Sequence, residues 1–311
     1  MMVLSMKKIP VILDVDTGID DALGILLATY SDKLDVLAIM AVNGNASLVD
    51  TYSNTCAIAS YLKLTIPIGK GCAEALNKSS IHAYDAHGNH GLGDIEIPYK
   101  SNKDKAVDAI ELYIELLSHS SVPITIIATG PLTNLATLII NHPEIKTKIK
   151  QICFMGGSLS KGNITSHAEF NVYCDPEACQ IVLQSHIPLV MIPLDVTRLT
   201  TYNASDLSFI QKGLNPAQTI FTHLLEYYLK SFQKRTGLKA APLHDSSAVA
   251  YICHSEWFTS KPYALSVDTS QNKTRAKINI LLEPVSNIEV ITSANQEAIV
   301  QMTIDSVNWI K

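Results

Sequence analysis

Short apolar runs alternate with longer segments of mixed character along most of the chain, a pattern typical of α/β proteins. Runs of β-branched and aliphatic residues predict buried strands at residues 11–15, 34–42, 124–128, 151–155 and 189–194. The segments between them predict helices at 22–30, 48–62, 105–119, 132–141 and 176–185. Strands that alternate with helices indicate a parallel sheet with right-handed crossovers.

The C-terminal part is expected to add elements to this sheet. Residues 203–254 are interpreted as mainly helical, with a helix at 248–254 that opens at 242–247. Strands at 264–267, 276–282 and 288–292 and a last helix at 295–310 follow. No repeat or linker divides the chain. We therefore expect one domain over residues 1–311, with an open, mostly parallel, Rossmann-like sheet flanked by helices and additional helices and strands in the C-terminal part.

Composition narrows the kind of partner. The formal net charge is −5, and the Lys and Arg residues are scattered rather than clustered as in a surface that binds a nucleic-acid polymer. A small molecule is therefore the expected ligand. The six cysteines form no C-x-x-C pair and read as reduced thiols of a cytoplasmic protein. No apolar stretch approaches the ~20 residues that a membrane span needs.

Four aspartates crowd the junction between the first strand and the first helix: Asp14, Asp16, Asp20 and Asp21. Taken alone, Asp20 could equally be a helix N-cap with no role in a site. Like charges within ~4 to 6 Å raise one another's pKa unless a cation offsets them, so the group as a whole indicates a divalent metal site. Oxygen ligands favour calcium or magnesium over zinc.

Polar segments follow each of the predicted strands, and in parallel sheets such segments form one ligand-binding rim. They begin at Asp16, Asn43, Thr129, Met155 and Asp195. The Gly-, Asn- and His-rich residues 69–102 lack a sustained period, and a loop of this length in a compact chain is usually functional or disordered.

Two further polar pairs stand out, although neither is specific when taken alone. His244 and Asp245 lie at a predicted helix start, where Asp245 could be a cap and His244 a loop histidine. Glu169 and Asn171 lie in the loop after the glycines at 156–157.

The first junction is similar to the D-x-D-x-[TV] motif of haloacid-dehalogenase phosphatases. That alternative would make the protein a magnesium-dependent phosphatase using Asp14 and Asp16. Gly18 stands where the motif has Thr or Val, which weakens this interpretation.

Taken together, the motifs closely resemble those of the nucleoside hydrolase family, the inosine-uridine-preferring type. They are DVDTGIDDA at 14–22, NGN at 43–45, HGNHGLG at 87–93, TGPLTN at 129–134, MGG at 155–157, GNITSHAEFN at 162–171, DPEA at 175–178 and HD at 244–245. They occur in the family's order, and the first of them with the AEFN segment is highly specific.

The resemblance implies a calcium-dependent enzyme that hydrolyses the N-glycosidic bond of ribonucleosides, usually as a homo-oligomer (dimer or tetramer). Asp16 would be the general base and His244 the proton donor to the leaving base, with Asp14 orienting Asp16 from behind. The implied calcium ligands are Asp16, Asp21, the carbonyl of Thr129 and Asp245. The implied substrate-binding residues are Asp20, Asn45, His87, Met155, Asn163, Glu169 and Asn171.

Two questions stay open at this point. Base preference is undecided, with Tyr227, Tyr228 and Arg235 as candidates for base contacts. A non-catalytic nucleoside- or calcium-binding protein is a further alternative, against which the intact set of acids and His244 argues.

Overall fold

The computed structural model describes residues 7–77, 81–95, 106–211, 215–282 and 288–310. Strands and helices alternate through its N-terminal part. The elements up to the middle of the chain are β1 (Ile9–Val15), α1 (Ile19–Tyr30), β2 (Leu34–Ala41), α2 (Leu48–Tyr61), β3 (Ile68–Lys70), α3 (Tyr84–His87), β4 (Val107–Asp108), α4 (Ala109–His119), β5 (Ile124–Ala128), α5 (Thr133–Asn141), η1 (Pro143–Lys148) and β6 (Ile149–Met155).

The second half is richer in short elements. They are α6 (Phe170–Cys174), α7 (Pro176–Leu183), β7 (Leu189–Ile192), α8 (Leu194–Thr197), β8 (Thr201–Asn203), α9 (Ala204–Leu207), α10 (Pro216–Thr236), β9 (Ala240–Pro242), α11 (His244–Cys253), η2 (Ser255–Trp257), β10 (Phe258–Pro262), β11 (Ala264–Val267), β12 (Ile278–Leu281), β13 (Ile288–Ala294) and α12 (Gln296–Asn308).

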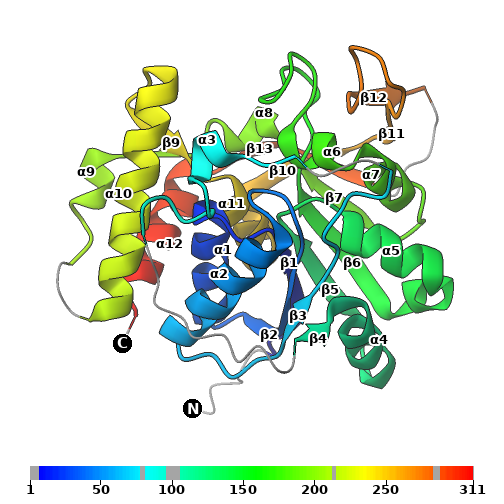
Figure 1. Ribbon diagram of the computed structural model, residues 1–311, viewed down its shortest axis with the longest axis horizontal. Coiled ribbons are helices and arrows are strands. Elements are labelled where there is room, and N and C mark those ends of the chain that lie inside the picture. Colours follow the sequence, from blue (N-terminus) through cyan, green and yellow to red (C-terminus); the bar gives the residue numbers. More distant parts are fainter. Residues whose placement is uncertain (1–6, 78–80, 96–105, 212–214, 283–287, 311) are drawn as a thin grey trace.

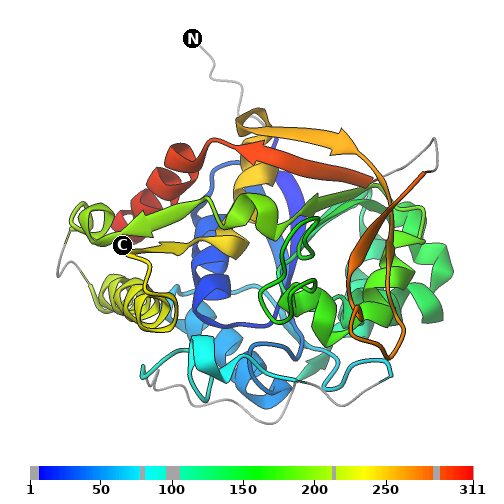
Figure 2. The ribbon, with the colours of Figure 1, turned by 90° about the horizontal axis from the view of Figure 1, so that it is seen from above.

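Within the described ranges, nine strands form the central sheet in the order β10-β13-β7-β6-β5-β1-β2-β3-β4. All neighbours are parallel except β10, which pairs antiparallel with β13 at one edge (Figure 2). The hairpin β11–β12 forms a separate small sheet beside this one. The predicted open, mostly parallel sheet with additional C-terminal strands and helices is therefore confirmed.

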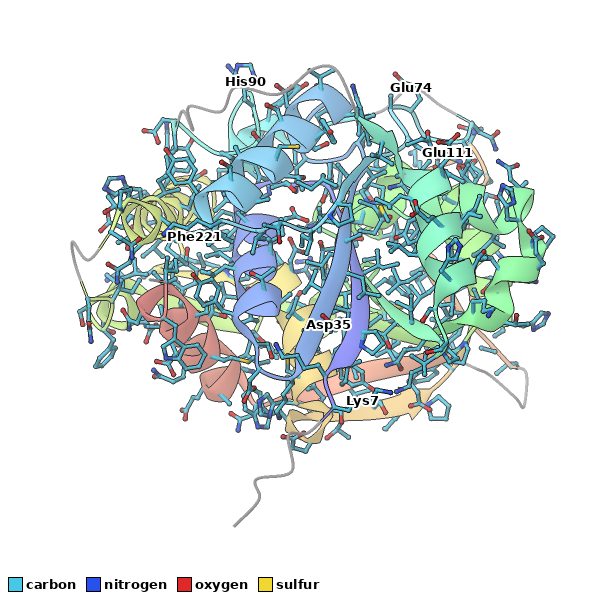
Figure 3. The ribbon with its side chains drawn as sticks, turned by 90° about the horizontal axis from the view of Figure 1, so that it is seen from below. Lys7, Asp35, Glu74, His90, Glu111 and Phe221 are labelled. Atoms are coloured by element: carbon cyan, nitrogen blue, oxygen red, sulfur yellow. The ribbon has the colours of Figure 1, made fainter. Side chains whose placement is uncertain are left out.

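The two faces of the sheet are covered by different helices (Figure 1). Because side chains alternate along a strand, Leu13 of β1 joins a buried cluster with α1, α10, α11 and α12, whereas Ile12 joins a second cluster with α4, α5 and α7. Phe221 of α10 and Glu111 of α4 mark these opposite sides in Figure 3.

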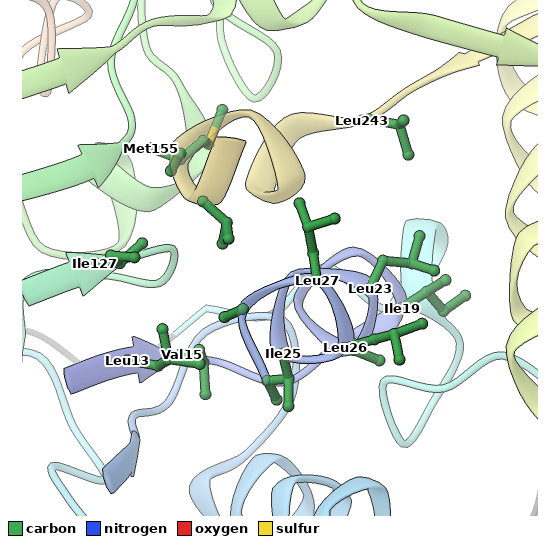
Figure 4. Close-up of a cluster of buried hydrophobic side chains, with 14 of the residues drawn as sticks. Leu13, Val15, Ile19, Leu23, Ile25, Leu26, Leu27, Ile127, Met155 and Leu243 are labelled. Carbon is green, nitrogen blue, oxygen red and sulfur yellow. The ribbon is translucent and has the colours of Figure 1, made fainter. Parts of the chain in front are cut away.

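Helix α1 is the central element of the first cluster. Its residues from Ile19 to Ala28 are buried on all sides, and it packs against α10, α11, α12 and β2 at once. Leu27 points toward α11, and Leu13 and Val15 enter the same cluster from β1 (Figure 4). This packing holds the first strand-to-helix junction rigidly at the centre of the molecule.

Several predicted boundaries were wrong. Helix α11 begins at His244 rather than at residue 248, and the strand expected at 189–194 ends at Ile192 because Leu194 opens α8. Asp108 caps α4 by accepting hydrogen bonds from the N–H groups of Ile110 and Glu111, so this helix starts after residue 108 rather than at 105, which lies outside the described residues. Strands β3, β4, β8, β9 and β10 were not predicted.

In the part of the chain that the structure describes, no helix is both long and apolar enough to cross a membrane.

Candidate active site

The carboxyl ends of the central strands meet at one edge, where hydrogen bonds join the polar residues that follow them. The Asn45 N–H donates to Asp16 Oδ2 at 2.7 Å, and the Thr129 hydroxyl donates to Asp21 Oδ1 at 2.7 Å. The Asn171 side-chain amide donates to the Thr129 carbonyl at 2.7 Å. The turns after β1, β2 and β5 therefore share one rim, as the strand pattern predicted.

Five aspartates are buried at this rim, and their pKa values are shifted upward. Burial is the largest cause for each of them. It raises the pKa of Asp14 and of Asp20 to about 7. The pKa values of Asp16 and Asp245 are raised well above the ordinary value, since each also faces the negative charge of Asp21. The site thus concentrates buried acidic groups, several of which raise one another's pKa.

Asp20 connects the two halves of the site. Its Oδ2 accepts hydrogen bonds from the backbone N–H groups of His244 at 2.7 Å and Asp245 at 3.2 Å. These groups are the first donors of α11, which have no partner within their own helix. One interpretation of the sequence was that Asp20 caps a helix. It does so, but the capped helix is α11 and not α1, to which Asp20 itself belongs. The N-terminus of α1 is closed by Asp21 Oδ2, which accepts from the Gly18 N–H at 3.0 Å.

Asp14 lies behind this rim. Its Oδ2 accepts hydrogen bonds from the Tyr113 hydroxyl at 2.8 Å and from the Asn134 amide at 3.1 Å. The same Asn134 accepts from the Cys72 N–H at 2.8 Å, so it also fastens the segment after β3. Tyr113 of α4 was not predicted, because nothing in the sequence near it marks a site. Asn134 lies inside the TGPLTN motif, so the sequence marked it as part of the family pattern but predicted no role for it.

The donor set suits a hard cation. Asp16 Oδ1 and Asp20 Oδ1 are buried without a hydrogen-bond partner, an arrangement that is costly unless something compensates it. No hydrogen bond reaches the Asp245 carboxylate from the described residues. Calcium and magnesium bind oxygen ligands, and either ion would compensate the negative charge of these carboxylates. No group of three or more His, Cys, Asp or Glu side chains in the described ranges is arranged as a ready-made metal centre.

A cavity of about 750 Å³ opens directly above the acids. Every residue predicted to bind substrate lines it: Asp20, Asn45, His87, Met155, Asn163, Glu169 and Asn171. Three of the predicted metal or catalytic residues, Thr129, His244 and Asp245, line it as well. Asp16 and Asp21 are not among the lining residues. They are almost fully buried, which places them behind the cavity wall.

Glu169 is held rigidly at the cavity wall. Its Oε2 accepts from the backbone N–H groups of Gly157 at 2.9 Å and Val172 at 3.0 Å, and its Oε1 accepts from the Asn171 N–H at 2.8 Å. The carboxylate therefore caps α6 while its side chain faces the cavity.

Two histidines line the cavity, His87 from α3 and His244 from α11. His87 Nδ1 accepts a hydrogen bond from the Ile19 N–H at 3.2 Å, and His244 Nδ1 lies 2.7 Å from Thr197 Oγ1. Burial lowers the pKa of both imidazoles to about 3, and the cation of Arg235 adds to the shift. Both pKa values therefore lie well below the ordinary histidine value of about 6.5.

The base-side candidates are separated by the structure. Tyr228 and Arg235 of α10 line the cavity, whereas Tyr227 does not and packs near Gly93 instead. Phe232 lies one helical turn beyond Tyr228 and lines it as well, with the Arg235 guanidinium 5.8 Å from its ring centre. The sequence predicted Tyr228 and Arg235 on this side of the cavity but not Phe232, because an aromatic residue on a helix is most often part of the core.

Comparison with known proteins agrees with this geometry. The sequence profile described as inosine-uridine preferring nucleoside hydrolase matches residues 11–301. The pyrimidine-specific ribonucleoside hydrolase RihA of Salmonella typhimurium is 36% identical over 307 residues, covering 97% of this chain and 99% of the relative. The Escherichia coli protein of the same name is 36% identical over the same length and shares.

Solved structures agree as well. The purine-preferring ribonucleoside hydrolase of Gardnerella vaginalis superposes with a TM-score of 0.88 at 27% identity, covering 97% of this chain and 98% of that one. The plant nucleoside hydrolase PpNRh1 gives a TM-score of 0.90 at 23% identity, covering 97% and 100%, and supports the fold.

The fold, the acid-lined cavity and these similarities define a hydrolase that cleaves the N-glycosidic bond of ribonucleosides. The chain belongs to the inosine-uridine-preferring nucleoside hydrolase family. This result decides against the phosphatase and the non-catalytic alternatives.

Proposed function

We propose that this hydrolase is calcium-dependent, with Asp16 as general base and His244 as proton donor to the leaving base. The observation that carries the proposal is the set of buried carboxylates, Asp16 and Asp20 with an unpaired oxygen each, beside a cavity that His244 also lines. A buried ionised carboxylate without a donor is costly unless a cation compensates its charge, and hydrolysis of a glycosidic bond uses a base for the water and an acid for the leaving group.

Asp16, Asp21, the Thr129 carbonyl and Asp245 would hold the calcium ion. When bound, the ion would lower the pKa of the attacking water and neutralise the acids around it. Asp16 would then accept the proton of that water. The Asn45 N–H bond to Asp16 Oδ2 keeps this carboxylate oriented, with Oδ1 left for the reaction.

Asp20, Asn163, Glu169 and Asn171 would bind the ribose hydroxyls, with Asn45 and Met155 beside them. Positive charge gathers on the ribose as the base departs. Fixed carboxylate and amide oxygens stabilise that charge more than they stabilise the neutral substrate, which is the condition for catalysis. Because Glu169 is already fixed by backbone donors, it needs no reorganisation during the reaction.

We further propose a preference for pyrimidine ribonucleosides. The relatives that are 36% identical are named as pyrimidine-specific, whereas the purine-preferring enzyme is 27% identical. The geometry of His87 agrees with this preference. Since its Nδ1 accepts from the Ile19 N–H, its one proton is on Nε2, where it can donate to the carbonyl oxygen beside the glycosidic nitrogen of a pyrimidine.

The test is chromatography of the products after incubation with uridine, cytidine, inosine and adenosine, first with calcium and then with excess chelator. We expect free base and ribose from uridine and cytidine at much higher kcat/KM than from the purines, and none after chelation. Product formation that persists in chelator would contradict calcium dependence. An equal rate on purines would contradict the base preference alone.

A homo-oligomeric state, a cytoplasmic location and one domain over residues 1–311 remain predictions from the resemblance and the composition. Light scattering behind a sizing column tests the first of these, with a dimer or tetramer as the expected result.

A further inference from the structure

The two cavity histidines differ in what binds their Nδ1 atoms. His87 Nδ1 accepts from the backbone N–H of Ile19 at 3.2 Å. A backbone amide can only donate, so this bond exists only while His87 is uncharged. Protonation of His87 would place two N–H groups against each other. His87 can therefore donate a hydrogen bond from Nε2 but is a poor proton carrier.

His244 has a different partner. Its Nδ1 lies 2.7 Å from the Thr197 hydroxyl, and within the described ranges this hydroxyl makes no other hydrogen bond. A hydroxyl both donates and accepts, and it rotates to suit its partner. The same contact therefore persists whether His244 is neutral or an imidazolium.

Thr197 is itself fixed in place. It is fully buried at the end of α8, and its backbone N–H donates to the Pro193 carbonyl at 3.1 Å. The backbone of His244 is held independently, because its N–H donates to Asp20 at 2.7 Å. The backbone and Nδ1 of His244 are therefore both held by hydrogen bonds. The other ring nitrogen, Nε2, is the one available to a substrate in the cavity that His244 lines.

We propose that Thr197 is a positioning residue that makes His244, rather than His87, the proton carrier of the reaction. The inference rests on the proposed function and deepens it. In the acid step the Nε2–H bond of the imidazolium breaks, the proton passes to the departing base, and the electron pair stays on Nε2. The Nδ1–H remains and donates to the Thr197 oxygen throughout.

The experiment compares two substrates in three variants. Thr197→Val keeps the shape of the side chain but removes the hydroxyl. General acid catalysis contributes roughly 10²- to 10⁴-fold, so we expect Thr197→Val to lose about tenfold or more in kcat on uridine. We expect a much smaller loss on p-nitrophenyl riboside, whose leaving group needs no proton. Thr197→Ser keeps the hydroxyl and should restore most of the activity on uridine, whereas His244→Ala should show the same selectivity as Thr197→Val in stronger form.

A matched control is Thr259→Val, on the exposed edge strand β10, no residue of which lines the cavity. This substitution should leave both rates and the thermal unfolding midpoint near those of the parent protein. Equal losses of Thr197→Val on both substrates would mean a merely structural role and would overturn the inference, as would an unchanged rate on uridine. If His244→Ala itself loses both substrates equally, the acid role in the proposed function fails. If only Thr197→Val lacks the selectivity, the inference about Thr197 fails alone.

Discussion

The carboxylate of Asp20 accepts a hydrogen bond of 2.7 Å from the backbone N–H of His244, a residue 224 positions later in the chain. One acidic side chain at the start of α1 therefore caps the helix that carries the other half of the site. The contact fixes the separation between the acids of the first junction and the pair His244 and Asp245. It also leads to the first prediction.

Asp20→Ala should destabilise the protein relative to Asp20→Asn. The alanine leaves the first N–H groups of α11 without an acceptor, and the loss of such a cap costs about 1 kcal/mol. Asparagine keeps an acceptor without the buried charge. Urea unfolding in excess chelator measures the difference. Equal unfolding free energies for the two variants would show that the cap contributes nothing to stability.

Calcium should raise the unfolding temperature more at high pH than at low pH. In the metal-free protein the pKa values of Asp14 and Asp20 are raised from 3.8 to about 7, so their stabilising contribution is complete below 3.8 and is lost as the pH rises through about 7. His87 and His244 act in the opposite sense, because pKa values lowered to about 3 make folding less favourable as the pH falls below their ordinary value. The pKa values of the proposed ligands Asp16, Asp21 and Asp245 are raised as well, chiefly by burial, and calcium binds ionised carboxylates, so its effect grows as protons leave these three groups.

Thermal unfolding with and without calcium, at about pH 5.5 and about pH 8, checks this expectation. Asp245→Asn is the control, since it removes one proposed ligand and should reduce the calcium effect at both pH values. A calcium shift that is the same at both pH values would contradict the proposed ligand set.

Two glycine substitutions should have opposite outcomes. A Cβ at Gly44 would overlap the Asp16 carboxylate, and displacing a reacting group by about 1 Å can cost roughly a hundredfold in rate. Gly24→Ala is the matched change, because its Cβ would lie at an ordinary 3.8 Å from Asp245 and alanine favours a helix interior by up to about 1 kcal/mol. Steady-state kinetics and unfolding of both variants test this pair. A fully active Gly44→Ala would argue against Asp16 as the base.

At saturating calcium, which as a bound cation would keep the proposed base Asp16 ionised, the rate on uridine should keep rising as the pH falls below neutrality. Burial lowers the pKa of His244 to about 3, so the protonated fraction increases about tenfold per pH unit over the accessible range. A histidine with an ordinary pKa would level off below about pH 6.5. The pH dependence of kcat shows which applies, with p-nitrophenyl riboside as the reference that should lack this rise. A plateau near pH 6.5 would contradict the lowered pKa.

Local pattern predicted the sheet well where strands are buried on both faces. Residues 124–128 were expected as a strand and form β5 with the same bounds, since a fully buried parallel strand is a continuous apolar run. Strands such as β3 and β10 were missed because the first is three residues long and the second is an exposed edge, so neither has a clear apolar signature. The early start of α11 was missed because its cap comes from Asp20, which is remote in the chain.

By itself, the sequence determined the order of the long buried strands and the main helices, the crowding of acids after the first strand and, through its motifs, the family. These properties depend on neighbours along the chain. Only the tertiary structure decided that Tyr113 meets Asp14, that Tyr228 rather than Tyr227 lines the cavity, and that Thr197 binds His244. Such contacts join side chains from elements far apart in the chain, and their geometry depends on how whole helices pack on the sheet, which no local pattern of residues encodes.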